Sequence, residues 1–206
     1  MPVYAYRTIQ QPAEGIYKEK GSKFLAFAYP VKSEGDIREK LDALRKEYFD
    51  ARHHCYAWML GPERKMFRAN DDGEPNHSAG DPILGQIRSK ELTNILVVVV
   101  RYFGGTKLGV GGLINAYKVS AEDALNHATI TELEVTEPIT ILYDYASTPE
   151  VMKLVKDFDL KIISQDFSNG CSMEAEIRLK VKDSFTEKVK LMKALGTAID
   201  VPALPL

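Results

Sequence analysis

The sequence predicts a two-domain protein of mixed α/β and α+β architecture, with domains that cover residues 1–135 and 136–206. A chain of 206 residues is long enough for one large or two small domains. A buried strand pattern leads into a glycine-rich loop and a helix in the first part, and a βαββαβ pattern fills the last part. The composition, with 45% hydrophobic and 27% charged residues, is that of a folded globular protein.

Strand and helix patterns alternate along the first domain. The segment 94–103, NILVVVVRYF, is a continuous β-branched run, which is typical of a central strand buried on both faces. Ser33 is placed to cap a helix whose Ile37 and Leu41 fall on one face. The predicted strands cover residues 3–9, 23–31, 54–60, 64–69 and 94–103, and the predicted helices cover residues 33–49, 81–91 and 111–127.

The second domain is predicted to be a ferredoxin-like βαββαβ unit. Thr148 and Pro149 favour the start of its first helix, and Asp183 is placed to cap its second. Asn169-Gly170 is a strong signal for a tight hairpin between two strands. The predicted strands cover residues 138–145, 161–167, 172–181 and 197–201, and the helices cover residues 148–158 and 183–195.

Charge and cysteine usage limit the functional classes. The net charge is −2, and residues 1–135 carry equal numbers of basic and acidic residues, so a polyanion site must come from a local cluster. The longest apolar run, Ile95–Val100, is too short to cross a bilayer, and the start of the chain has no signal-peptide pattern. Cys55 and Cys171 lie far apart, which favours a cytoplasmic protein with reduced thiols.

The strongest chemical pattern is the block from Arg101 to Leu113, RYFGGTKLGVGGL. A loop without Cβ atoms can turn its N–H groups toward one point, and the start of the following helix adds positive partial charge. The block therefore predicts an anion pocket, although its glycines could serve strand–helix packing alone. It matches neither a P-loop nor a dinucleotide-binding fingerprint. The candidate anion- or RNA-binding residues are Arg101, Gly104, Gly105, Lys107, Gly109, Gly111 and Gly112.

An acidic loop, NDDGEPNHSAG at 70–80, is the second pattern. Asp71, Asp72 and Glu74 could bind a hard cation through oxygen, or they could orient backbone groups within the loop. We expect these residues to form the rim of the anion pocket or a metal site, with His53 beside them. The ligand spacing of an EF-hand is missing.

The triplet His53-His54-Cys55 could join such a site only in part. Adjacent residues of a strand point to opposite faces, so the two histidines are not expected to share one site. A metal site with Asp71 or His77 and a hydrogen-bonded core histidine both remain open. Cys55 has no base placed by spacing that would make it a nucleophile.

A basic and aromatic segment extends from Tyr17 into the predicted strand 23–31. Lys18, Lys20 and Lys23, with Tyr17 and Phe24, could form a basic and aromatic strand surface that contacts a nucleic-acid backbone. The alternative is a solvated strand face.

Several of these blocks, in this order, resemble the Impact/YigZ family. The blocks are Ala51–Ala57, Asp71–Pro75, Ala79–Leu84 and Arg101–Leu113, and the resemblance covers about residues 16–128. Many relatives have Ser-Gly-Thr-Ala-Gly where this chain has Asn76–Gly80. The resemblance implies a first domain similar to the second domain of a small-subunit ribosomal protein. It also implies a ferredoxin-like domain similar to the last domain of elongation factor G.

The resemblance also implies a role near translation. Eukaryotic Impact proteins regulate translation under amino-acid starvation, and bacterial members are expected to associate at most with nucleic acid or the ribosome. The leading hypothesis is a non-enzymatic, cytoplasmic, translation-associated regulatory protein that binds RNA, the ribosome or a phosphate group through the glycine-rich loop. Its partners would be RNA, the ribosome or another translation protein, with no membrane and no cofactor.

Two alternatives remain at this point. The first is a Mg²⁺-dependent enzyme that acts on a phosphorylated small molecule or nucleotide, with the acidic loop holding the metal. The second is a protein-interaction adaptor in which neither loop binds a ligand. The sequence leaves the oligomeric state open.

Overall fold

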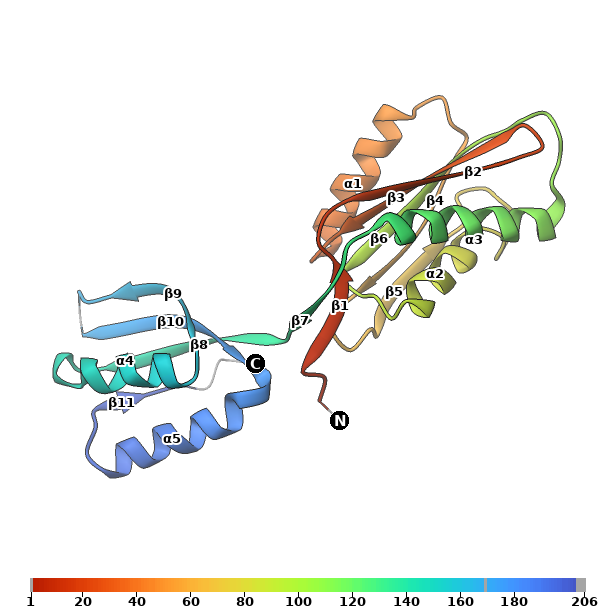
Figure 1. Cartoon of the computed structure of the whole chain (residues 1–206). Coiled ribbons are helices and arrows are strands. Elements are labelled where there is room, and N and C mark those ends of the chain that lie inside the picture. Colours follow the sequence, from red (N-terminus) through yellow and green to blue (C-terminus); the bar gives the residue numbers. More distant parts are fainter. Residues whose placement is uncertain (1, 169, 203–206) are drawn as a thin grey trace. The chain divides into compact units, whose positions relative to one another are not determined.

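The computed structural model describes residues 2–168 and 170–202 and divides into two compact units (Figure 1). One unit comprises Ala5–Leu133, and the other comprises Met1–Tyr4 with Glu134–Leu206. The mixed two-domain architecture predicted from the sequence is confirmed. Within the described ranges, no helix is long and apolar enough to span a bilayer.

The unit Ala5–Leu133 is built on a five-stranded antiparallel sheet in the order β2-β3-β6-β4-β5. A separate two-stranded sheet is formed by β1 and β7. The strands of the unit are β1 (Ala5–Ile9), β2 (Ala13–Glu19), β3 (Ser22–Pro30), β4 (His53–Leu60), β5 (Met66–Asn70), β6 (Ile95–Tyr102) and β7 (Ile130–Glu134).

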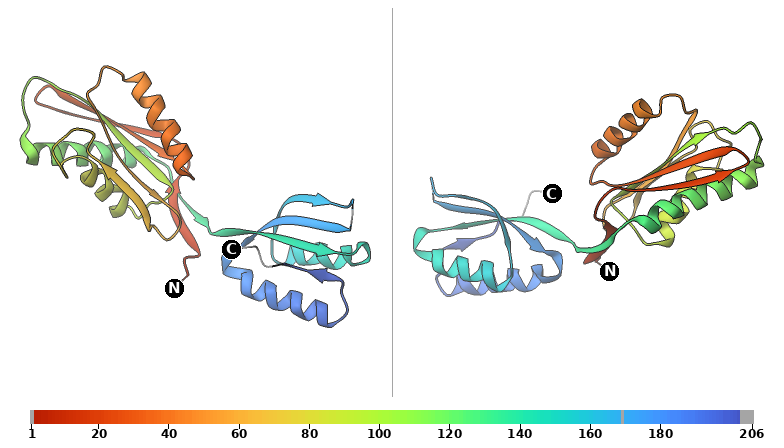
Figure 2. Two further views of the ribbon diagram at one scale, coloured as in Figure 1. Left: turned by 180° about the vertical axis from the view of Figure 1, so that it is seen from behind. Right: turned by 45° about the horizontal axis from the view of Figure 1, so that its top comes forward.

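Helices cover both faces of the five-stranded sheet (Figures 1 and 2). Helices α2 (Gly80–Ser89) and α3 (Gly109–His127) pack on one face, and α1 (Glu34–Glu47) packs on the other. Strand β6 is the third of the five strands, and its alternate residues enter the two cores. The predicted central strand is therefore confirmed, as is the hairpin of β4 and β5.

Helix α1 begins as predicted, because Ser33 and Asp36 form a reciprocal capping box. Strand β2 was not predicted, since Gly15 interrupts its pattern. A Cβ atom at Gly15 would lie 2.3 Å from the backbone nitrogen of Ala124, so this glycine lets α3 approach the strand closely. Strand β7 was also missed. Helix α3 begins at Gly109, two residues earlier than expected.

The second unit has the predicted βαββαβ order. Its sheet runs β11-β8-β10-β9, and two helices pack on one face of it (Figure 1). The elements are β8 (Thr136–Tyr143), α4 (Thr148–Asp157), β9 (Lys161–Asp166), β10 (Cys171–Arg178), α5 (Lys182–Ala194) and β11 (Ile199–Asp200). The core of this unit contains Ile141, Val151, Met173, Ile177 and Phe185.

Three local predictions in this unit need correction or comment. Ser147 is the N-cap of α4, and Thr148 is its first residue. Asp183 lies inside the first turn of α5, where no side chain caps the helix. The third strand ends at Arg178 because a 3-10 turn, Leu179–Val181, follows it. Of the predicted Asn169-Gly170 turn, residue 169 lies outside the described residues.

Candidate functional site

The acidic loop is organised by the carboxylate of Asp71. This carboxylate accepts N–H bonds from His77 at 2.8 Å, Ala79 at 3.0 Å and Gly80 at 2.8 Å. Burial alone would raise the pKa of Asp71, but these donated hydrogen bonds outweigh it and hold the pKa below its usual range. Asp71 therefore fixes the loop and the start of α2, and it does not line the pocket described below.

Asp72 ties the loop to strand β4. Its carboxylate accepts the N–H of His54 at 2.7 Å, and its carbonyl oxygen lies 2.8 Å from Nδ1 of His53. A carbonyl can only accept, so Nδ1 of His53 donates the hydrogen bond, and in the neutral ring Nε2 carries a lone pair. The two histidines separate as predicted: His53 lines the pocket, and His54 is buried.

Glu74 forms a buried ion pair with Arg101. Their side chains are 4% and 8% exposed, and Oε1 of Glu74 lies 2.5 Å from Nη1 of Arg101. The Tyr117 hydroxyl donates to the same oxygen at 2.7 Å, and Nε2 of His53 lies 4.0 Å from it. The Cys55 thiol donates to the carbonyl oxygen of Asp71 at 3.0 Å and lies 3.3 Å from the Tyr117 hydroxyl, and burial raises the pKa of this thiol far above neutrality. Cys55 is thus an inert member of the network.

A pocket of about 480 Å³ opens beside this network. It brings together five residues that the sequence singled out. These are His53, Glu74, Arg101, Lys107 and, at the start of α3, Gly109. Sequence reasoning missed its other walls, which come from three different segments of the chain. These are Arg52, Pro75, Phe103, Leu108, Val110 and Leu113.

The N-terminus of α3 lines part of the pocket. No side chain caps this helix at Leu108, and its first turn contains no acidic residue. The first N–H groups of a helix have no partner within the helix, and the helix dipole makes this end positive. The predicted glycines of this helix differ in why a glycine is needed. Gly109 has a left-handed φ of +72°, which favours glycine, whereas Gly111 has no such φ and a Cβ atom there would meet open space.

Gly104 joins the glycine-rich loop to the turn between β2 and β3. A Cβ atom at Gly104 would lie 1.9 Å from the carbonyl carbon of Gly21, so the two backbones are in direct contact. The N–H of Gly104 also donates to the Ser22 hydroxyl at 3.2 Å. Gly105 has φ of +87° and faces open space, and a Cβ atom at Gly112 would lie 2.9 Å from Cβ of Leu108.

This contact places the basic hairpin beside the loop. Lys18 and Lys23 are cross-strand partners, and Lys20 lies in the turn. The prediction that Tyr17 and Phe24 belong to this basic surface is wrong. Phe24 is fully buried, and Tyr17 packs against the same core. Adjacent residues of a strand face opposite sides, which separates the aromatic residues from their lysine neighbours.

The acidic loop and His53 do not assemble a metal site. In residues 2–168 and 170–202, no group of three or more His, Cys, Asp or Glu side chains is placed to hold a metal ion. The physical reason is that each carboxylate already has a partner: Asp71 and Asp72 accept backbone N–H groups, and Glu74 pairs with Arg101. The Mg²⁺-dependent alternative thus lacks a donor cluster here.

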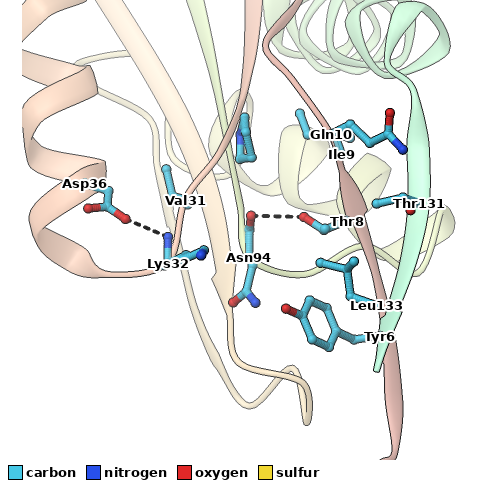
Figure 3. A pocket seen from close by; sticks show the side chains of 11 residues that line it. Tyr6, Thr8, Ile9, Gln10, Val31, Lys32, Asp36, Asn94, Thr131 and Leu133 are labelled. Carbon is cyan, nitrogen blue, oxygen red and sulfur yellow. Dashed lines mark hydrogen bonds between the residues drawn. The ribbon is translucent and has the colours of Figure 1, made fainter. Parts of the chain in front are cut away.

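A second cavity, of about 510 Å³, lies between the β1–β7 pair and the start of α1 (Figure 3). Some of its polar groups are hydrogen-bonded within the protein. The Thr8 hydroxyl donates to the carbonyl oxygen of Asn94 at 3.2 Å, and the Asp36 carboxylate accepts the N–H of Lys32 at 2.7 Å. Tyr6 and Leu133 form a more apolar side of the cavity.

The fold and the site define a two-domain α/β protein with a cationic pocket at a helix N-terminus. A model of the Impact N-terminal domain family matches residues 20–125. The chain belongs to the Impact family, as its sequence blocks predict.

Relatives match over most of the chain. It is 29% identical to the IMPACT family member YvyE of Bacillus subtilis, over 90% of this chain and 85% of that protein. It is 32% identical to the IMPACT family member YigZ of Escherichia coli, over 76% of this chain and 78% of that protein. The crystal structure of a hypothetical protein superposes with a TM-score of 0.76 at 27% identity and covers 99% of both chains.

Proposed function

We propose that this protein is a translation-associated regulatory protein whose first unit binds RNA through its phosphate backbone. Membership of the Impact family supports the association with translation. The observation that carries RNA binding is a set of five cations, which lie on the pocket at the start of α3 and on the β2–β3 hairpin that contacts the glycine-rich loop. Arg52 and Lys107 line the pocket there, and the hairpin docked on Gly104 supplies the rest, namely Lys18, Lys20 and Lys23.

These five cations are free to meet an external anion. Within the described part of the chain, none of them forms an ion pair with a carboxylate. Lys18 and Lys23 stand directly opposite each other, and like charges in that position destabilise a strand pair unless an anion screens them. Several phosphates along a backbone would provide that screening.

In this proposal Arg101 is a structural residue of the pocket because it pairs with Glu74. Glu74 neutralises its charge, so Arg101 holds the wall of the pocket and contributes little net charge to it. The phosphate-binding charges are therefore Lys107 and Arg52, with the hairpin lysines beyond them.

In the second unit, the face of the sheet that carries no helix has a mixed charge. This face presents Glu174 and Glu176 from β10. Lys161 of β9 pairs with Glu176, and the Ser164 hydroxyl donates to Glu174 at 3.0 Å. This face is suited to contacts with a protein partner, so we assign RNA binding to the first unit alone.

The test is the salt dependence of RNA binding by the full-length protein. Binding of a fluorescent single-stranded RNA is measured by anisotropy between low and physiological salt. Each phosphate contact contributes about −0.7 to the slope of log K against log salt. We expect Lys107→Ala and Arg52→Ala each to weaken binding and to flatten the slope by about that amount.

Lys65→Ala is the matched control. Lys65 is an exposed lysine beyond the other end of β4, where it pairs with Glu63. It should leave both the affinity and the slope unchanged. Equal affinities and slopes for Lys107→Ala and Lys65→Ala would refute the proposed function.

A further inference from the structure

We infer that the pocket at the start of α3 takes one unpaired nucleotide, with its phosphate on the helix N-terminus and its base on Phe103. This inference rests on the proposed function and adds a preference for single-stranded over double-stranded RNA. It requires two kinds of surface in one cavity, one for the phosphate and one for the base.

The phosphate surface is the uncapped end of α3 with Lys107 and Arg52. An independent observation supports a ligand there. The Arg101 side chain is 8% exposed and lines the same cavity, yet its Nε–H has no acceptor among the described residues. Buried N–H groups of this kind are normally satisfied, so this donor leaves an unmet hydrogen bond in the wall of the pocket.

The base surface is apolar and exposed. The Phe103 ring is 53% exposed directly after β6, and Val110 on the first turn of α3 is equally exposed. Both residues line the pocket, together with Pro75 and Leu113. The guanidinium of Arg101 lies 5.7 Å from the centre of the Phe103 ring, which helps to hold this ring in place. An exposed aromatic ring beside cationic groups is the arrangement on which unpaired bases stack.

His53 adds a polar contact to this cavity. Its Nδ1 donates to the carbonyl oxygen of Asp72, so in the neutral ring Nε2 is the acceptor atom, and His53 lines the pocket. A hydroxyl or amino group of a nucleoside could donate to it. The cavity volume of about 480 Å³ is in the usual range for a small-ligand site, and it can contain a nucleoside.

Base stacking on Phe103 is incompatible with an intact duplex. The bases of an A-form helix are paired and stacked on one another, and they present no face to a protein side chain. Phosphate contacts alone would be similar for both forms. The preference for a single strand therefore depends on Phe103, whereas the salt dependence depends on the cations.

The nucleotide could be free or part of a strand, and the experiment separates these sources. Anisotropy competition on the full-length protein compares three probes: nucleoside monophosphates, a single-stranded RNA of mixed sequence, and the duplex of that sequence. We expect the single strand to bind most tightly, because the hairpin lysines add phosphate contacts that a monophosphate lacks. If a nucleoside monophosphate competes as strongly as the single-stranded RNA at the same molar concentration, the site is one for free nucleotides.

Phe103→Leu tests the base contact. Stacking of one base on an aromatic side chain is worth about 5- to 150-fold in affinity, so we expect single-strand affinity to fall by at least about fivefold. Duplex affinity and the salt slope should not change. Phe49→Leu is the control, since Phe49 is 81% exposed and lies outside the pocket.

The two proposals fail in different ways. If Phe103→Leu leaves single-strand affinity unchanged while Lys107→Ala flattens the salt slope, RNA binding stands and the base contact is refuted. If no RNA binds to the wild-type protein with a salt-dependent affinity, the proposed function itself is refuted. Phe103 is exposed, so a loss of binding by its leucine variant does not reflect unfolding.

Discussion

Replacement of Glu74 by alanine is expected to destabilise the first unit severely. The change removes the carboxylate that neutralises Arg101 and accepts the hydroxyl of Tyr117. Because the Arg101 side chain is 8% exposed, its charge is then left buried without a partner. Breaking a buried pair from one side costs about 3–5 kcal/mol, a large part of the stability of a typical domain.

The measurement uses the single tryptophan of the sequence. Trp58 is 8% exposed and belongs to the same unit, so its fluorescence during urea unfolding follows this unit. Glu74→Gln keeps an acceptor and a similar shape but loses the charge, and it should give an intermediate loss. The double variant Glu74→Ala, Arg101→Met removes the orphaned charge, so it should recover a substantial part of the loss.

Two results would contradict this reasoning. A loss below about 1 kcal/mol for Glu74→Ala would mean that the pair behaves as a solvated surface pair. A double variant less stable than Glu74→Ala alone would mean that Arg101 contributes through packing against Phe24, whose ring centre is 5.5 Å from the guanidinium. The first result would mean that Glu74 and Arg101 do not act as a buried ion pair. The second would mean that Arg101 stabilises the unit by packing and not by its charge.

Three further predictions concern the loop contact and two titrating groups. Gly104→Ala should lower the free energy of unfolding by about 1–3 kcal/mol through overpacking against Gly21, and it should weaken RNA binding. Gly111→Ala places its methyl group in open space, so it should leave the stability unchanged or raise it. Urea titrations measure the stability of both variants, and anisotropy measures their RNA binding. Burial lowers the pKa of His54, so its contribution to stability is complete above about pH 6.5 and is lost as the pH falls from there through the folded-state pKa. His54→Leu should therefore flatten the dependence of the urea midpoint on pH between about 8 and 5. The pKa of Asp71 is lowered, so its contribution is present above about pH 4 and is lost below it, and Asp71→Asn should flatten the acid limb of the same curve.

Patterns that depend on neighbouring residues could be predicted from the sequence. Ser33 caps α1 because the hydroxyl and the N–H group it serves are only three residues apart. The β-branched run of β6 needs two covered faces whatever the rest of the chain does. The paired histidines separate because strand geometry alone forces them to opposite sides.

Contacts between distant segments could not be predicted in this way. In the sequence, Gly15 indicates a break in a strand. In the fold it lies within β2, where the backbone of Ala124 in α3 leaves no space for a Cβ atom. Gly104 meets the backbone of Gly21, a contact between segments far apart in the sequence that no local pattern reveals. The partner of Arg101 is 27 residues away, so its charge appears free in the sequence and is neutralised in the fold.

The acidic loop therefore contributes to a basic site as its scaffold. The carboxylates of Asp71 and Asp72 accept hydrogen bonds from backbone N–H groups, and the carboxylate of Glu74 forms an ion pair with Arg101. These carboxylates hold the loop and His53 against the pocket while their negative charge is compensated locally. The remaining field at the N-terminus of α3 comes from Lys107 and the other unpaired cations. Under the proposed function, these cations would give a chain with a net charge of −2 a local anion site, and an affinity that depends steeply on salt would be its signature.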